Sequence, residues 1–93
     1  MKNTDARYDR LVVFTSIHDA MRAAKLLTAA GIAFVEIPTP REIDLSCGQS
    51  ILLTAAEEEA ALSALKDGLA RWARLYSRDG LNRIYEKLKE YVE

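Results

Sequence analysis

Two short apolar runs, each followed closely by a helix-start signal, constrain the fold of this chain more than any other feature. Residues 11–14 (LVVF) are rich in β-branched and aromatic side chains, which is typical of a buried central strand. Ser16 behind them predicts a helix N-cap. Residues 50–53 (SILL) predict another strand, and Thr54 with Glu57 forms the capping box of a second helix.

Apolar residues recur at helical spacing behind both start signals. In the first helix, which has the acidic Asp19 in its first turn and ends at Gly31, the residues expected to face the core are Ile17, Ala20, Met21, Ala24 and Leu27. In the second helix, which extends to about residue 69, the corresponding residues are Ala61, Leu62, Leu65 and Leu69. Each helix is therefore predicted to bury one face.

Two further strands complete the order of elements. Residues 32–37 predict a second strand that ends at Pro38, because proline cannot continue a strand ladder. Residues 38–49 form the longest irregular segment, and residues 72–76 predict a fourth strand. The order predicts an α+β fold, a ferredoxin-like βαββαβ sandwich with both helices on one face of an antiparallel sheet. Another α+β arrangement of the same elements remains open.

An additional C-terminal amphipathic helix is predicted over residues 79–93. Asp79 and Gly80 introduce it, and its apolar stripe consists of Leu81, Ile84, Tyr85, Leu88, Tyr91 and Val92. We expect it to cover part of the open sheet face or to pack against a second subunit.

Composition limits the classes of function. The 93 residues suit a single domain over residues 1–93, and the net charge of -1 supplies no basic field for nucleic acid. The longest uncharged stretch, residues 45–56, is too short and too polar to span a membrane. The one cysteine excludes an intramolecular disulfide, which fits a cytoplasmic location.

That cysteine, Cys47, is the one plausible reactive group. In the predicted topology the first strand ends at the edge where the third strand begins, so Cys47 should lie near the helix N-terminus at Ser16 and His18. The free N–H groups and the positive end of the helix dipole there favour a thiolate and lower a cysteine pKa. Arg41 in the same loop adds a positive charge. Gly48 allows close backbone approach or a positive φ.

Plainer readings of these residues stay open. A lone cysteine is often a small buried hydrophobe. Arg41 is explained more simply by a solvated loop charge, and His18 by a solvent-facing position rather than by a hydrogen bond or proton transfer to the sulfur. No paired spacing of cysteine or histidine marks a metal site, since Cys47, His18, Asp44 and Glu42 are isolated candidates. The sequence therefore predicts neither metal nor cofactor.

One further pattern carries a resemblance. Phe14-Thr15-Ser16-x-His18-Asp19-Ala20, then Gly31-Ile32, Ile37-Pro38-x-Pro40-Arg41 and Cys47-Gly48 occur in this order. Together they resemble the selenium/sulfur carrier-like family, over about residues 8–77. The resemblance implies a small α/β domain, sometimes fused to sulfur carriers of the TusA type. The Cys-Pro-x-Pro motif of TusA itself is missing, and the predicted helix over residues 79–93 lies outside the match.

By that resemblance Cys47 is the carrier residue, with Arg41 and Gly48 as the rest of the motif. The predicted topology adds Ser16 and His18 as supporting residues. The implied function is sulfur or selenium carriage on Cys47 as a persulfide-type species, between donor and acceptor proteins, rather than enzymatic turnover. An alternative is a non-enzymatic small-ligand or protein-interaction module that acts through dimerisation or its C-terminal helix. A redox enzyme ranks last, because the chain has no second cysteine to resolve an oxidised one.

Overall fold

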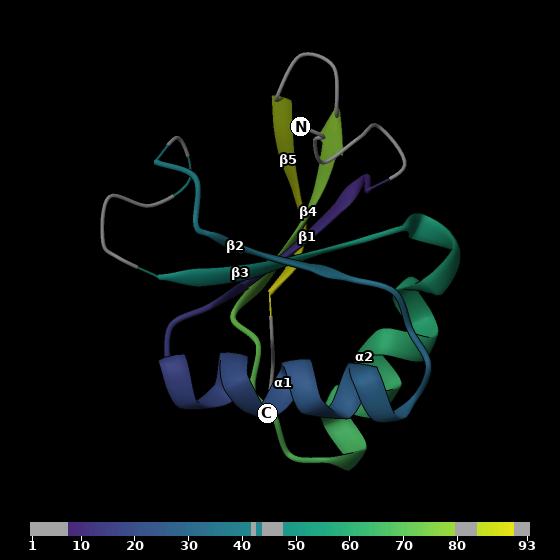
Figure 1. The fold of residues 1–93 in the computed structure, drawn as a ribbon. Helices are drawn as coiled ribbons and strands as arrows, with labels where there is room; N and C mark the ends of the chain where they lie inside the picture. The colour runs from purple at the N-terminus through teal and green to yellow at the C-terminus, as the bar shows by residue number, and fades with distance from the viewer. Residues whose placement is uncertain (1–7, 42, 44–47, 80–83, 91–93) are drawn as a thin grey trace.

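The computed structural model describes residues 8–41, 43, 48–79 and 84–90. Over these residues the chain forms a five-stranded antiparallel sheet in the order β2-β3-β1-β4-β5, with both helices on one side of it (Figure 1). The elements in chain order are β1 (Arg10–Phe14), α1 (Ile17–Ala29), β2 (Val35–Pro38), β3 (Gln49–Leu53), η1 (Ala55–Glu57), α2 (Glu58–Asp67), β4 (Arg74–Asp79) and β5 (Ile84–Glu90). The mixed α+β class is confirmed.

The two apolar runs form the middle of the sheet. β1 and β3 pair antiparallel with Arg10 opposite Leu53 and Phe14 opposite Gln49, as predicted for central neighbours. Val12 and Phe14 belong to the core under the helices, whereas Leu11 and Val13 belong to a second core. Because successive side chains of a strand point to opposite faces, the strand is buried on both. This explains why the run is continuously apolar rather than alternating.

The buried face of α1 differs from the predicted stripe. Ala20 and Leu27 are buried as expected, and Ala23, which was left out of the stripe, is fully buried. Ile17 and Met21 are 54% and 57% exposed, so their assignment to the core was wrong. Small side chains at the contact let a helix approach the sheet closely, and the larger Ile17 and Met21 then lie on the flank of α1.

α2 ends at Asp67, two residues before the predicted end. Ala61 and Leu65 are buried as predicted, but Leu69 is 75% exposed and its place in the core stripe was wrong. The N–H of Leu69 donates to Lys66 O (3.1 Å) and that of Ala70 donates to Leu65 O (2.9 Å). This is a Schellman motif, in which the residue after the C-cap is left-handed.

Leu69 occupies that left-handed position with φ of 62°, a conformation that costs a non-glycine residue roughly 1–2 kcal/mol. Gly68 is next to Leu69 in the sequence but does not take the left-handed position; it lies where the two helices pack together. A Cβ at Gly68 would lie 2.4 Å from both terminal methyl carbons of Leu26, so any other residue there would force the Leu26 side chain to move where α2 packs against α1. At the end of α1 the same motif has the predicted Gly31, with φ of 74°.

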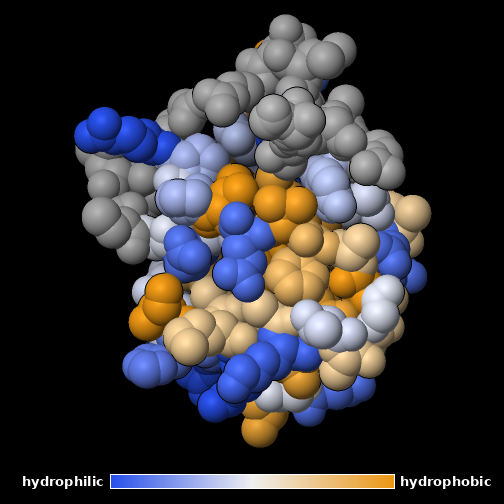
Figure 2. Space-filling model, in the orientation of Figure 1, coloured by the Kyte–Doolittle hydropathy of each residue, from blue (hydrophilic) through white to orange (hydrophobic). Residues whose placement is uncertain are grey.

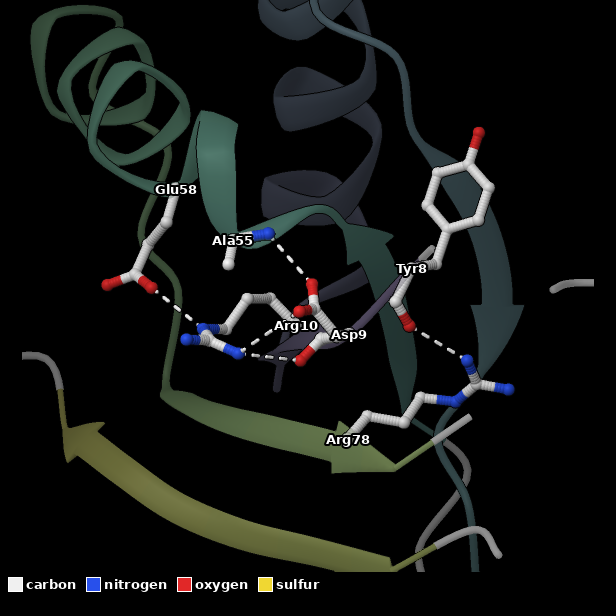
Figure 3. A network of polar contacts seen from close by, with 6 residues as sticks. All are labelled: Tyr8, Asp9, Arg10, Ala55, Glu58 and Arg78. Carbon is white, nitrogen blue, oxygen red and sulfur yellow. Dashed lines mark hydrogen bonds and ion pairs between the residues drawn. The ribbon is translucent and has the colours of Figure 1, made fainter. Parts of the chain in front are cut away.

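The start of the second helical segment is capped by the residue that precedes β1. Thr54 occupies the N-cap position of η1, but its side chain makes no capping hydrogen bond, so the predicted capping box was wrong. Instead Asp9 Oδ1 accepts from the N–H of Ala55 (2.8 Å; Figure 3). Beside it, Arg10 Nε donates to Glu58 Oε1 (2.9 Å), which ties β1 to the first turn of α2.

The predicted C-terminal helix was wrong: residues 84–90 form strand β5, which pairs antiparallel with β4. Asp79 pairs with Ile84, and a bulge in the register makes Leu88 an extra residue between Lys87 and Lys89. Asp-Gly between two strand-compatible runs is a strong hairpin signal, and here it outweighs the helical spacing of the apolar residues. Residues 80–83 and 91–93, including Leu81, Tyr91 and Val92 of the predicted stripe, lie outside the described residues.

The other strand boundaries differ by a few residues. β2 begins at Val35 rather than at residue 32 and includes Pro38, which an edge strand tolerates. β4 begins at Arg74, so Trp72 precedes the strand and packs in the core under the helices.

A second core lies on the sheet face opposite the helices. Leu11, Val13, Leu52 and Tyr76 are buried there, with Tyr8, Val35, Ile37, Ile43 and Tyr85 packed against them. Figure 2 shows a further apolar area, partly solvent-exposed and interrupted by charged residues, over β2 and the adjoining flank of α1. No helix in the described part of the chain is long and apolar enough to cross a membrane.

Candidate functional site

The two ends of the segment over residues 40–47 are held together at its base by Thr39. The N–H of Thr39 donates to Gly48 O (3.0 Å). Its hydroxyl shares a hydrogen bond of 2.7 Å with the hydroxyl of Ser50, and both side chains are buried. Sequence reasoning missed this pair, although a serine at the start of a buried strand signals a need for a partner, because buried hydroxyls are almost always hydrogen-bonded.

Gly48 serves close packing rather than a left-handed backbone. A Cβ at this position would lie 3.0 Å from Thr39 Oγ1 and 3.2 Å from the carbonyl oxygen of Phe14. Among the described glycines only Gly31 has a positive φ. Of the two roles predicted for Gly48, the structure therefore has the close approach.

The same contact places Gly48 at the end of β1, and α1 begins three residues further along the chain. Phe14 pairs with Gln49, and Ser16 is the N-cap of α1. The hydroxyl of Ser16 accepts from the N–H of Asp19 at 3.4 Å, so it serves the helix start. His18 lies exposed in the first turn.

Arg41 lies in the turn after β2, toward the sheet face opposite the helices. It is exposed in a turn in which the N–H of Ile43 donates to Pro40 O (3.0 Å). Ile43 packs against the second core, so the turn leaves the sheet on the face opposite the helices (Figure 1). The structure thus brings Gly48 and Ser16 to one edge, and it attaches the turn that carries Arg41 to the opposite face from His18.

Cys47 itself lies outside the described residues, as do Glu42 and Asp44. Its exposure and its distance from α1 therefore remain predictions. Among the residues that the structure describes, no three histidine, cysteine or acidic side chains gather closely enough to hold a metal ion.

Comparison with known protein families gives a match. A family model described as "Putative Se/S carrier protein-like" matches residues 9–77. The chain belongs to this family. The match confirms the resemblance carried by the sequence motifs, and it covers β1 to most of β4, including both helices and the segment before Gly48. In this Se/S carrier-like chain, β5 lies beyond the matched part. No curated protein and no solved structure matches the chain.

Proposed function

We propose that this chain is a sulfur or selenium carrier that holds the chalcogen on Cys47 as a persulfide-type species and passes it between a donor and an acceptor protein. Its membership of the Se/S carrier-like family supports the class of cargo. The order of the first four strands, β2-β3-β1-β4, supports a ferredoxin-like scaffold to which β5 adds an edge. We place the carrier in the cytoplasm, where a single thiol stays reduced.

The observation that carries the proposal is the anchored Gly48. Cys47 is its neighbour in the sequence, and Gly48 is hydrogen-bonded to Thr39 and in contact with the carbonyl of Phe14, at the end of β1. A carrier thiol needs a defined base for its loop, because donor and acceptor must both reach the sulfur. The N-terminus of α1 follows this edge and offers a positive dipole end to a thiolate.

The transfer itself needs no oxidant. The Cys47 thiolate attacks the terminal sulfur of a persulfide on the donor, and a new S–S bond forms on Cys47. The donor's S–S bond breaks, and its own cysteine leaves as a thiolate with the electron pair. Delivery to the acceptor repeats the exchange in the other direction.

Intact-mass measurement tests this function. After incubation with a cysteine desulfurase and free cysteine, we expect the wild type to gain the mass of one sulfur atom and Cys47→Ala to gain none. The pH dependence of alkylation should also give a Cys47 pKa below that of an ordinary cysteine. A wild-type protein without any Cys47-dependent adduct would refute carriage. The alternative module loses its C-terminal helix as an interaction element, since residues 84–90 form a strand.

A further inference from the structure

A cavity of about 630 Å³ opens between the two helices and the loop that follows α2. Four charged residues line it: Asp19 and Arg22 in α1, Lys66 at the end of α2, and Arg71 in the loop before β4. Three of them are cationic and one is anionic, in a chain whose net charge is only -1. The cavity therefore concentrates positive charge against the overall balance of the molecule.

Asp19 contributes structure to this cavity. Its Oδ1 accepts from the backbone N–H of Arg71 at 3.2 Å, which holds the loop against the first turn of α1. The loop is tied to the sheet as well, because the N–H of Ala73 donates to Val13 O (2.7 Å). Asp19, the one acidic group among the described residues of the cavity, thus accepts a hydrogen bond from a backbone N–H. The loop on this side of the cavity is held by hydrogen bonds to α1 and to β1.

Arg22 is positioned by a strained residue. Its Nη1 donates to the carbonyl oxygen of Leu69 (3.3 Å), and Leu69 is the residue held at φ of 62°. A guanidinium has five N–H donors, so this bond orients the group and leaves donors for a ligand. Strained backbone is typical of ligand-binding segments. A cation in the second turn of α1 also gains nothing from the helix dipole, which favours negative charge at that end.

Lys66 adds a second donor. Its position in the last turn of α2 suits the negative end of that helix, but its ammonium forms no ion pair within the described residues. A guanidinium and an ammonium that line one concave site match the oxygens of a tetrahedral anion. Cations on a convex surface of this chain would instead suit a flat, acidic surface of a partner protein.

We propose that this cavity binds a small tetrahedral oxyanion, such as phosphate, sulfate or thiosulfate, through Arg22, Lys66 and Arg71. This inference does not depend on the proposed function. The cavity opens at the edge of the sheet where β1 ends and β4 begins, which is also the edge of Gly48.

Titration of the isotope-labelled Cys47→Ser protein tests the site by NMR. Sodium phosphate and sodium thiosulfate are added separately at constant ionic strength, with chloride as the reference anion. We expect saturable shifts of the backbone amides of Leu69, Ala70 and Arg71 with both oxyanions and none with chloride. Tighter binding of thiosulfate than of phosphate would assign the site to a sulfur-bearing anion, and equal binding to oxyanions in general.

A matched pair of lysine variants distinguishes binding at this cavity from attraction by the overall charge of the protein. Lys66→Gln should weaken phosphate binding by about fivefold or more. Lys25→Gln removes the same charge from α1, but Lys25 lines a different hollow beside Phe34, so binding should not change. Leu69→Gly keeps both the left-handed turn and the backbone carbonyl oxygen to which Arg22 donates, so it should leave phosphate binding unchanged.

Three results would overturn the site: shifts that never saturate, equal loss in both lysine variants, or shifts confined to other parts of the chain. Because the titration uses a protein without the thiol, its outcome is independent of the sulfur-transfer assay. A missing Cys47 adduct with intact phosphate binding refutes only the carrier. An adduct without phosphate binding refutes only the site.

Discussion

At the scale of single residues, Gly48 matters because glycine has only a hydrogen atom where every other residue has Cβ. The sequence motif predicted that glycine matters here, and the structure supplies the reason: a Cβ would lie only 3.0 Å from Thr39 Oγ1 and 3.2 Å from the carbonyl oxygen of Phe14, so these neighbours would have to shift. The Thr39–Ser50 hydrogen bond below it was beyond prediction. Two hydroxyls eleven positions apart are paired only by the register of β2 against β3.

The two glycines with different roles give a residue-scale prediction. Gly48→Ala should lower the free energy of unfolding by about 1–3 kcal/mol, because the new methyl group is overpacked against Thr39 and a backbone carbonyl. Gly31 has open space and φ of 74°, so Gly31→Asn should cost less than Gly31→Ala, since asparagine tolerates the left-handed region. Gly48→Asn should lower the free energy of unfolding more than Gly48→Ala does.

Urea denaturation of the four variants measures these differences. A Gly48→Asn protein that is more stable than the Gly48→Ala protein would contradict the steric explanation.

At the scale of elements, the two helices were located correctly from their apolar spacing, and Ser16 and Gly31 were predicted correctly at the two ends of α1. The cap at the start of η1 was not. The spacing between Ala61 and Leu65 is a property of the local chain, and it predicts which face is buried. The cap of η1 is not local, because Asp9 reaches it from the residue before β1, 46 positions away in the sequence. Thr54 had the right identity for a cap but is not used as one.

Asp9→Ala should therefore destabilise the protein by about 1 kcal/mol, the usual cost of a lost cap. Thr54→Ala is the matched control and should cost clearly less, because no capping hydrogen bond of its side chain is lost. Chemical denaturation followed by circular dichroism compares the two. Equal losses, or a larger loss for Thr54→Ala, would show that the capping box acts after all.

At the scale of the whole molecule, the chain has a core on each side of its sheet, and β5 belongs to the second one. Tyr85 packs against that core, and it stands opposite Arg78 of β4. The segment was interpreted as a helix because its apolar residues also fit helical spacing. Lys89, whose ammonium lies 3.6 Å from a carboxylate oxygen of Glu58, links β5 to α2.

Tyr85 and Leu88 distinguish the strand from the predicted helix. In the strand Tyr85 is partly buried, so Tyr85→Ser should lower the free energy of unfolding by about 1–2 kcal/mol. Leu88 is the exposed extra residue of the bulge, so Leu88→Ser should change it by no more than about 0.5 kcal/mol. Thermal unfolding measures both variants, and similar losses would fit a helix that buries both residues on one stripe.

The sequence by itself determined the two central strands, the two helices and the family, because apolar runs, helical spacing and short motifs are all local properties of the chain. The tertiary structure alone decided the rest: which flank of α1 is exposed, which residue caps η1, the strand at residues 84–90, and the charged cavity beside Leu69. Each of these depends on partners far away in the sequence. Long-range pairing adds burial and hydrogen bonds large enough to override a local preference.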